Sequence, residues 1–164
     1  MIELSVPSFI GKEKKYLLDC IKSSWVSSGG KYVGLFEKKI KKITGAKYVV
    51  ACINGTSALH IALKLAGVRK DDEVIVPTLT FIASINAIKY NDAEPIFMDV
   101  DKYYNIDQNK TLEFIKKKTY FNGTFSFNKK TKKRISAILI AHMWGNAADM
   151  EKIYSLCNQK KIKI

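Results

Sequence analysis

The chain has 164 residues, of which 47% are hydrophobic, and it carries a formal net charge of +13 at pH 7. This length is enough for one domain with a sizeable core, and no apolar run approaches the roughly 20 residues that a membrane-spanning helix needs. Three cysteines (Cys20, Cys52 and Cys157) lie far apart, which predicts reduced thiols and argues against a disulfide framework or a zinc site. The first residues carry no basic segment followed by an apolar stretch, so we expect no secretory signal, no membrane partner and a cytoplasmic location.

The high positive charge raises the question of nucleic-acid binding. Lysines far outnumber arginines and are spread over the predicted helix faces, with one cluster at Lys129–Arg134. That cluster has no interleaved aromatic residues and precedes a predicted strand, which is typical of a solvated loop. We therefore expect no nucleic-acid partner.

The first part of the chain predicts two helices joined by a glycine-rich loop. The apolar spacing places one helix at Lys12–Ser23 and the next at Tyr32–Ile43, where Thr44-Gly45 ends it. The loop between them carries Trp25, which could fill a core position or form the wall of a ligand pocket. We expect these apolar side chains of the helices to point inward: Tyr16, Leu17, Cys20 and Ile21 in the first, and Val33, Phe36, Ile40 and Ile43 in the second.

From residue 45 onward, short apolar runs alternate with helical patterns. This alternation predicts an α/β fold, with three layers and a mostly parallel central sheet covered on both faces. We therefore divide the chain into 1–44, with helices and a loop, and 45–164, with the alternating strands and helices. Strands are expected at 48–52, 73–76, 93–100 and 135–141 with a fifth starting at 161, helices at 57–66, 81–90, 111–117 and 148–159, and a loop or hairpin insertion at 120–134.

The stretch Asn54–Leu63 is the best candidate for a binding motif. It places a Gly-Thr-Ser turn between a predicted strand and a helix. The first N–H groups of a helix lack internal partners, and the helix dipole adds partial positive charge there. Gly55 lets the backbone approach an anion, and the hydroxyls of Thr56 and Ser57 can donate to it. The alternative interpretation is a tight connection without a ligand.

Two further predicted strand exits carry unusual residues: Thr80-Phe81 and His142–Asn146. In a parallel sheet such exits share one edge, where ligands bind. An anion cradle together with Phe81 would suit a flat phosphorylated heteroaromatic cofactor such as pyridoxal 5′-phosphate. Neither a dinucleotide-binding motif nor a P-loop motif occurs in the sequence.

Metal binding has little support in the sequence. Asp99 and Asp101 end a predicted strand and could be metal ligands, but turn and cap roles are the commoner use of such acids. His60 lies in an apolar helical pattern, which favours a packed core histidine. We expect no metal site.

Short motifs match one known family along nearly the whole chain. The matching segments are Trp25–Val33, Phe36–Glu37, Asn54–His60, Asp72–Ile75, Leu79–Ala83, Asn86–Ala87, Pro95–Asp101 and His142–Met150. In this order they resemble the amino-terminal part of the DegT/DnrJ/EryC1/StrS sugar-nucleotide aminotransferases, which have the aspartate-aminotransferase type of fold. Within the family, the resemblance is closest to enzymes that aminate UDP-4-keto-6-deoxy-N-acetylhexosamines for legionaminic-acid-type pathways of lipopolysaccharide or other surface-polysaccharide biosynthesis.

The resemblance implies specific roles. Pyridoxal 5′-phosphate would be the cofactor, the UDP-linked keto sugar the amino acceptor, glutamate the amino donor, and a homodimer the full-length assembly. The residues implied are Gly55, Thr56 and Ser57 for the cofactor phosphate, Phe81 for stacking on the ring, His142 for orienting the ring, and Trp25, Ser27 and Gly29 for the substrate loop.

The family's two main catalytic groups have no counterpart in the matching segments. The resemblance places the aspartate on the pyridine nitrogen, and the lysine that attaches the cofactor, beyond Ile164. We therefore expect an incomplete large domain, without catalytic residues, that does not transaminate alone. The alternative is a non-catalytic phosphate-binding or dimerisation remnant of the same fold.

Overall fold

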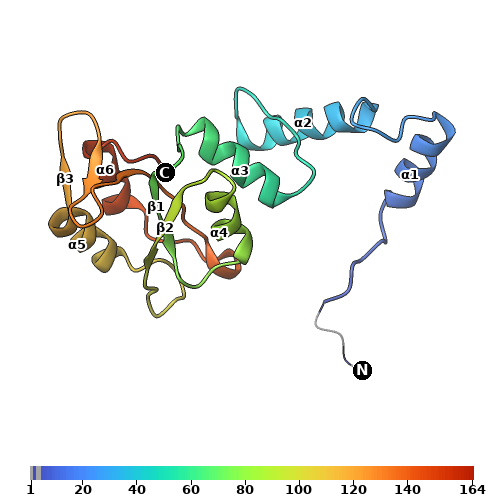
Figure 1. Ribbon diagram of the computed structural model, residues 1–164. Helices are drawn as coiled ribbons and strands as arrows, with labels where there is room; N and C mark the ends of the chain where they lie inside the picture. The colour runs from blue at the N-terminus through green and yellow to red at the C-terminus, as the bar shows by residue number, and fades with distance from the viewer. Residues whose placement is uncertain (1, 3–4) are drawn as a thin grey trace. The chain divides into compact units, whose positions relative to one another are not determined.

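The computed structural model describes residue 2 and residues 5–164 (Figure 1). The chain divides into two compact units, residues 1–51 (unit 1) and residues 52–164 (unit 2), and each is described by itself. The domain division expected after residue 44 stays a prediction. Within the described residues, no helix combines the length and apolar character needed to cross a membrane.

Unit 1 contains the two predicted helices, α1 at Glu13–Lys22 and α2 at Lys31–Thr44. Gly45 ends α2 in the left-handed conformation, with its N–H donated to the Lys41 carbonyl, as its position after the helix predicts. The predicted inward faces are wrong for most of their side chains: only Cys20, Val33 and Ile40 are half-buried, and no described residue of α1 or α2 is fully buried. The apolar spacing identified the correct helices, but the described residues of unit 1 form no further helix or strand that could cover their apolar faces.

The predicted strand at 48–52 is also wrong. These residues are assigned to no strand, and Tyr48 and Val50 are 78% and 79% exposed. The N–H of Ala51 donates instead to Glu37 Oε1 at 2.9 Å. A strand is stable only where a neighbouring strand accepts its N–H and C=O groups, and no described strand lies alongside this segment.

Unit 2 is built on one mixed sheet with the strand order β2-β1-β5-β4-β3 in the described part of the chain (Figure 1). β1 pairs in parallel with both β2 and β5, while β4 is antiparallel to β5 and β3. The insertion is therefore a hairpin, and Lys163 forms a parallel bridge to Ala137, where a fifth strand was expected to start. The strands are β1 Glu73–Pro77, β2 Glu94–Met98, β3 Thr119–Phe121, β4 Ser126–Asn128 and β5 Arg134–Ile138.

Helices cover both faces of this sheet, which confirms the three-layer α/β prediction. Successive side chains of a strand point to opposite faces. Accordingly, Val74 and Val76 of β1 belong to one apolar cluster, which includes residues of α3 and α4, whereas Ile75 belongs to the other, which includes residues of α5 and α6. The helices are α3 Gly55–Leu65, α4 Ile82–Lys89, α5 Gln108–Lys118 and α6 Glu151–Gln159, with a short 3₁₀ helix, η1, at Met143–Gly145.

A largely buried ion pair between Asp72 and Arg134 stabilises the start of the sheet. Arg134 of β5 donates through Nε to Asp72 Oδ1 at 2.8 Å and through Nη2 to Asp72 Oδ2, and Nη2 also donates to the Gly67 carbonyl at 2.7 Å. The hydrogen bonds to the Asp72 carboxylate raise the pKa of the Arg134 guanidinium, so the guanidinium stays charged. It ties the loop that leaves α3 to the first residues of β1 and β5.

Candidate functional site

The amino-terminal end of α3 is open to an anion. The side chain of Asn54 caps the helix, accepting the Ser57 N–H at 2.8 Å. Among the described residues, the N–H groups of Gly55 and Thr56 and the hydroxyls of Thr56 and Ser57 have no hydrogen-bond partner. A Cβ added to Gly55 would meet no heavy atom within 4 Å, so there is open space beside the backbone. These donors and the helix dipole suit a phosphate group.

The sequence did not identify Asn54 as a cap. Its side chain accepts a hydrogen bond from the Ser57 N–H. With Asn54 as the cap, α3 begins at Gly55, two residues earlier than predicted. An anion at this helix end would therefore meet the N–H groups of Gly55 and Thr56. The signal was available, because asparagine is among the preferred residues immediately before a helix.

Phe81 lies immediately before α4, which follows β1. Its side chain is 79% exposed, so its ring is available to a ligand. The helix itself is held against α3, since the Asn91 side chain donates to the carbonyls of His60 and Ala87 at 3.2 and 2.9 Å. Because α4 begins where β1 ends, and α3 ends near the start of β1, both helix N-termini lie at the carboxyl edge of the parallel strands.

His60 is not the fully packed core histidine that was expected. It is half-buried, and its ring lies edge-on to Tyr90, with the ring centroids 5.9 Å apart. The residue thus contributes to the contact between α3 and the end of α4.

His142 is held by the backbone of the segment that follows it. Its Nδ1 accepts the N–H of Ala148 at 3.1 Å, so the hydrogen of the neutral ring is on Nε2. The side chain lines an apolar cavity of about 250 Å³ together with Leu59 of α3 and Ile140 beyond β5. The structure therefore brings His142 next to the helix that begins with the anion-binding candidates.

Trp25, Ser27 and Gly29 lie in the loop of unit 1. Trp25 is 58% exposed, so the core-filling alternative is wrong. A Cβ added to Gly29 would lie only 3.0 Å from Trp25 Cζ3, and the Gly30 N–H donates to the Ser27 carbonyl at 3.1 Å. The loop is a tight turn with the tryptophan ring against Gly29. A substrate role for these residues stays a prediction.

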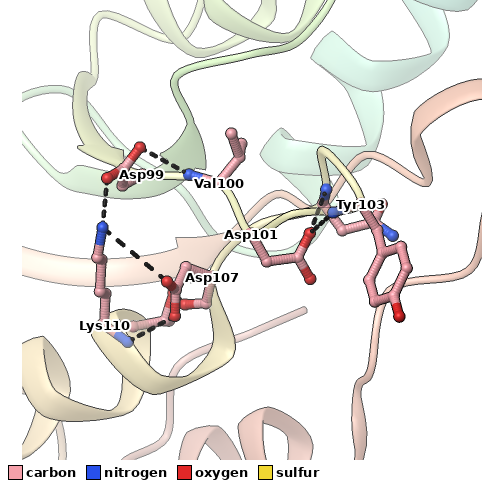
Figure 2. A network of polar contacts seen from close by, with 8 residues as sticks. Asp99, Val100, Asp101, Tyr103, Asp107 and Lys110 are labelled. Carbon is pink, nitrogen blue, oxygen red and sulfur yellow. Dashed lines mark hydrogen bonds and ion pairs between the residues drawn. The ribbon is translucent and has the colours of Figure 1, made fainter.

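The acidic residues after β2 form hydrogen bonds and an ion pair within the loop that leads to α5, as Figure 2 shows. Asp99 pairs with Lys110 Nζ, whose hydrogen bond lowers the pKa of that carboxyl. Asp101 Oδ1 accepts the N–H of Tyr103 at 2.8 Å, and Asp107 caps α5 by accepting the Lys110 N–H at 3.0 Å. These bonds confirm the turn interpretation for Asp101, whereas Asp99 forms an ion pair and the helix cap is Asp107.

A buried asparagine connects two loops at the same edge of the sheet. Asn105 is 3% exposed, and its Oδ1 accepts the Met143 N–H at 3.1 Å. The Gln108 side chain adds a second link to the Asp149 carbonyl, also 3.1 Å long. The sequence contained no signal for these links, because their partners lie about 40 residues apart along the chain.

The fold and the candidate site together indicate a broad class of enzyme. A helix-covered α/β sheet with an anion-ready helix terminus and an exposed aromatic ring at its carboxyl edge has the architecture of the large domain of aspartate-aminotransferase-like enzymes. The chain belongs to the DegT/DnrJ/EryC1/StrS aminotransferase family, whose model matches residues 7–164. Pyridoxal 5′-phosphate is the cofactor of this family, as the resemblance implied.

Individual relatives agree with this assignment. GDP-perosamine synthase from Escherichia coli O157:H7 is 39% identical over 156 residues, which cover 95% of this chain and 39% of the relative. A putative pyridoxal phosphate-dependent aminotransferase, EpsN, from Bacillus subtilis strain 168 is 32% identical, covering 96% of this chain and 38% of EpsN. A crystal structure of the aminotransferase from Psychrobacter cryohalolentis is similar with a TM-score of 0.78 and 29% identity, covering 95% of this chain and 36% of that one.

The chain spans about two fifths of the length of the curated relatives that it matches. The family and its cofactor are thus established, whereas the narrower legionaminic-acid assignment is not, because matching relatives include GDP- and dTDP-sugar enzymes.

Proposed function

We propose that the chain supplies the phosphate-holding part of an aminotransferase that acts on a keto sugar linked to a nucleoside diphosphate. The observation that carries this proposal is the open N-terminus of α3, where two backbone N–H groups and two hydroxyls have no partner in the described residues. Family membership adds the amino-transfer chemistry.

The proposed roles of the residues are binding and orientation. Gly55, Thr56 and Ser57 hold the phosphate of pyridoxal 5′-phosphate, and Phe81 presents its exposed ring to the flat face of the cofactor. His142 keeps one tautomer because Nδ1 is occupied by the Ala148 N–H, so Nε2–H is the donor available to a ligand. When bound, the cofactor would supply the electron sink for amino transfer.

For the substrate, we propose a UDP-linked 4-keto-6-deoxy-N-acetylhexosamine as the amino acceptor and glutamate as the donor. A GDP-linked sugar is the second candidate, because GDP-perosamine synthases are 34–39% identical to the chain. The two candidates are distinguished by measuring, with isothermal titration calorimetry in the presence of the cofactor, how tightly the protein binds the UDP-linked and the GDP-linked sugar; tighter binding of the GDP-linked sugar would contradict the UDP assignment.

The proposal includes that this chain alone does not transaminate, because the resemblance gives none of its lysines the role of attaching the cofactor. A non-catalytic phosphate-binding or dimerisation remnant is the alternative. Amino-sugar formation by this chain alone would contradict that part of the proposal.

The phosphate site has its own test, which is independent of activity. The affinity for pyridoxal 5′-phosphate is measured by equilibrium dialysis for the double variant Thr56→Val/Ser57→Ala. We expect a loss of about 10-fold or more, because hydrogen bonds to a charged group contribute roughly 1.5–3 kcal/mol each. The matched control is Thr124→Val/Ser155→Ala, which removes the same hydroxyls from exposed positions outside the site.

Pyridoxal, which lacks the phosphate, provides the second control. The variant at α3 and the unchanged protein should bind pyridoxal equally. If the variant keeps its affinity for pyridoxal 5′-phosphate, the α3 terminus does not hold the phosphate.

A further inference from the structure

Basic and acidic residues are unevenly distributed along the sequence of unit 2. From Phe114 to Ile164, twelve residues are lysine or arginine and only two, Asp149 and Glu151, are acidic. From Cys52 to Glu113, six residues are basic and nine are acidic. The proposed function makes no use of these basic residues.

The fold gathers the basic residues around the β3–β4 hairpin. The Lys129 N–H donates to the Lys118 carbonyl at 2.9 Å, which joins the residue after β4 to the end of α5. Ser126 of the hairpin donates to the Lys160 carbonyl at 2.7 Å, which joins it to the end of α6. In Figure 1, the hairpin and the helices α5 and α6 lie together at one end of unit 2.

Most of these lysines have no acidic partner. Among the described residues, Lys117 pairs with Glu113, Lys133 with Asp71 and Arg134 with Asp72. The remaining cations around the hairpin include five lysines without a carboxylate within 4 Å in the described part of the chain, which we call the basic patch: Lys118, Lys129, Lys130, Lys132 and Lys161. Lys160 is not counted, because its Nζ lies 5.8 Å from the centre of the Phe121 ring, which points to the opposite face of β3 from Tyr120. All five are exposed.

The chemistry of the patch does not favour nucleic acid. Arginine is the usual residue for bidentate phosphate contacts, and Arg134, the one arginine in this half of the sequence, is engaged with Asp72. Single-stranded nucleic acid also needs free aromatic faces for base stacking. Here Tyr120 stacks on Phe127 with a centroid distance of 5.4 Å, and Arg134 lies 5.0 Å from the centre of the Phe125 ring.

A diffuse anionic surface suits the patch better. Lysine is a compact point charge on a flexible stem, and clusters of lysines bind anionic headgroups without a defined contact geometry. Tyr120 and Phe125 each remain 41% exposed beside the lysines, and aromatic side chains partition favourably at the membrane–water interface.

We propose that the basic patch, with Tyr120 and Phe125, docks reversibly on an anionic lipid surface. Such peripheral binding needs neither a spanning helix nor a secretory signal, so the reasons for expecting no membrane partner do not apply to it. The proposal is independent of the proposed aminotransferase function, because it uses none of the cofactor residues.

The test compares two triple variants that remove the same charge. Sedimentation of the protein with vesicles is measured for phosphatidylcholine alone and for phosphatidylcholine mixed with phosphatidylglycerol, at low and physiological salt. The patch variant is Lys129→Gln/Lys130→Gln/Lys132→Gln. Its matched control is Lys38→Gln/Lys39→Gln/Lys42→Gln, which neutralises three exposed lysines of α2.

We expect binding only to the anionic vesicles, weakened by salt. The patch variant should lose on the order of 100-fold in partitioning, since each lysine near such a surface contributes about 1 kcal/mol, while the control keeps most of the binding. Far-UV circular dichroism checks that both variants are folded.

Three outcomes would overturn the proposal. The first is no binding to anionic vesicles at low salt. The second is an equal loss in both variants, which would mean that net charge alone drives binding. The third is a patch variant that loses affinity for single-stranded oligonucleotide but not for vesicles, which would assign the patch to nucleic acid.

Discussion

Unit 1 and unit 2 both contain the helices that apolar spacing predicts, but they differ in what the apolar side chains contact. In α2 of unit 1, Phe36 and Ile43 are 55% and 71% exposed. In unit 2, Ile88 of α4 and Ile115 of α5 are fully buried against the sheet.

The difference shows that the spacing of apolar residues predicts which face of a helix is apolar, but not whether another element packs against that face. An amphipathic helix forms wherever apolar residues recur every three or four positions, but burial needs a second element at the right place. Unit 2 supplies a sheet with helices on both faces. Three predictions test the comparison, from the largest expected effect to the smallest.

The largest effect should come from a pair of isoleucine truncations. Ile75→Ala removes a side chain of β1 that is 0% exposed and should lower the free energy of unfolding by about 4 kcal/mol, through lost burial and the cavity left behind. Ile43→Ala in α2 should change it by less than about 0.5 kcal/mol. Urea unfolding followed by circular dichroism measures both, and similar losses would remove the distinction between the units.

Breaking an ion pair should likewise destabilise unit 2 more than unit 1, with a smaller loss of unfolding free energy than the isoleucine truncation. Asp72→Asn leaves Arg134 without its carboxylate in a largely buried position, so we expect a loss of about 3 kcal/mol in the free energy of unfolding. In unit 1, Lys31 pairs with Asp19 at the surface, and Asp19→Asn should leave the urea midpoint unchanged. An unchanged midpoint for Asp72→Asn would show that the buried pair is not a structural link.

The smallest effect concerns a buried thiol and depends on pH. Burial raises the pKa of Cys157 to about 12 from its usual 9.0. The folded state therefore favours the neutral thiol, and its contribution is fully present below pH 9 and is lost between pH 9 and pH 12. At pH 10 the loss should be about 1.4 kcal/mol relative to pH 8.

The measurement is the difference in unfolding free energy between the unchanged protein and Cys157→Ala across this pH range. Because other groups titrate there too, only this difference reports on the thiol. The matched variant Cys52→Ala removes an exposed thiol and is the control for the loss of a cysteine side chain. A flat difference for Cys157→Ala would contradict the prediction.

Much of unit 2 was predictable because its signals are local. The runs that form β1 and β2, and the helices between and beside them, are read from residues a few positions apart. The anion-binding candidates Gly55, Thr56 and Ser57 are likewise a local pattern, and they lie at a helix N-terminus as predicted. Phe81, just after β1, follows from the same alternation.

The failures share one physical cause. The apolar, β-branched run at 48–52 looks like a buried strand, but a strand also needs hydrogen-bonding neighbours, and these are distant in the chain. The inward faces predicted for α1 and α2 failed in the same way, since the sequence specifies which side chains are apolar and not what lies opposite them.

The sequence by itself determined the helices, the α/β alternation, the family and the local chemistry at the start of α3. Only the tertiary structure decided that Arg134 meets Asp72, 62 positions away, that the Ala148 N–H sets the tautomer of His142, and that the ends of α5 and α6 and the turn between β4 and β5 meet at the hairpin. Local patterns depend on the few residues within a helical turn or a strand pleat. These contacts depend instead on which segments the folded sheet brings together.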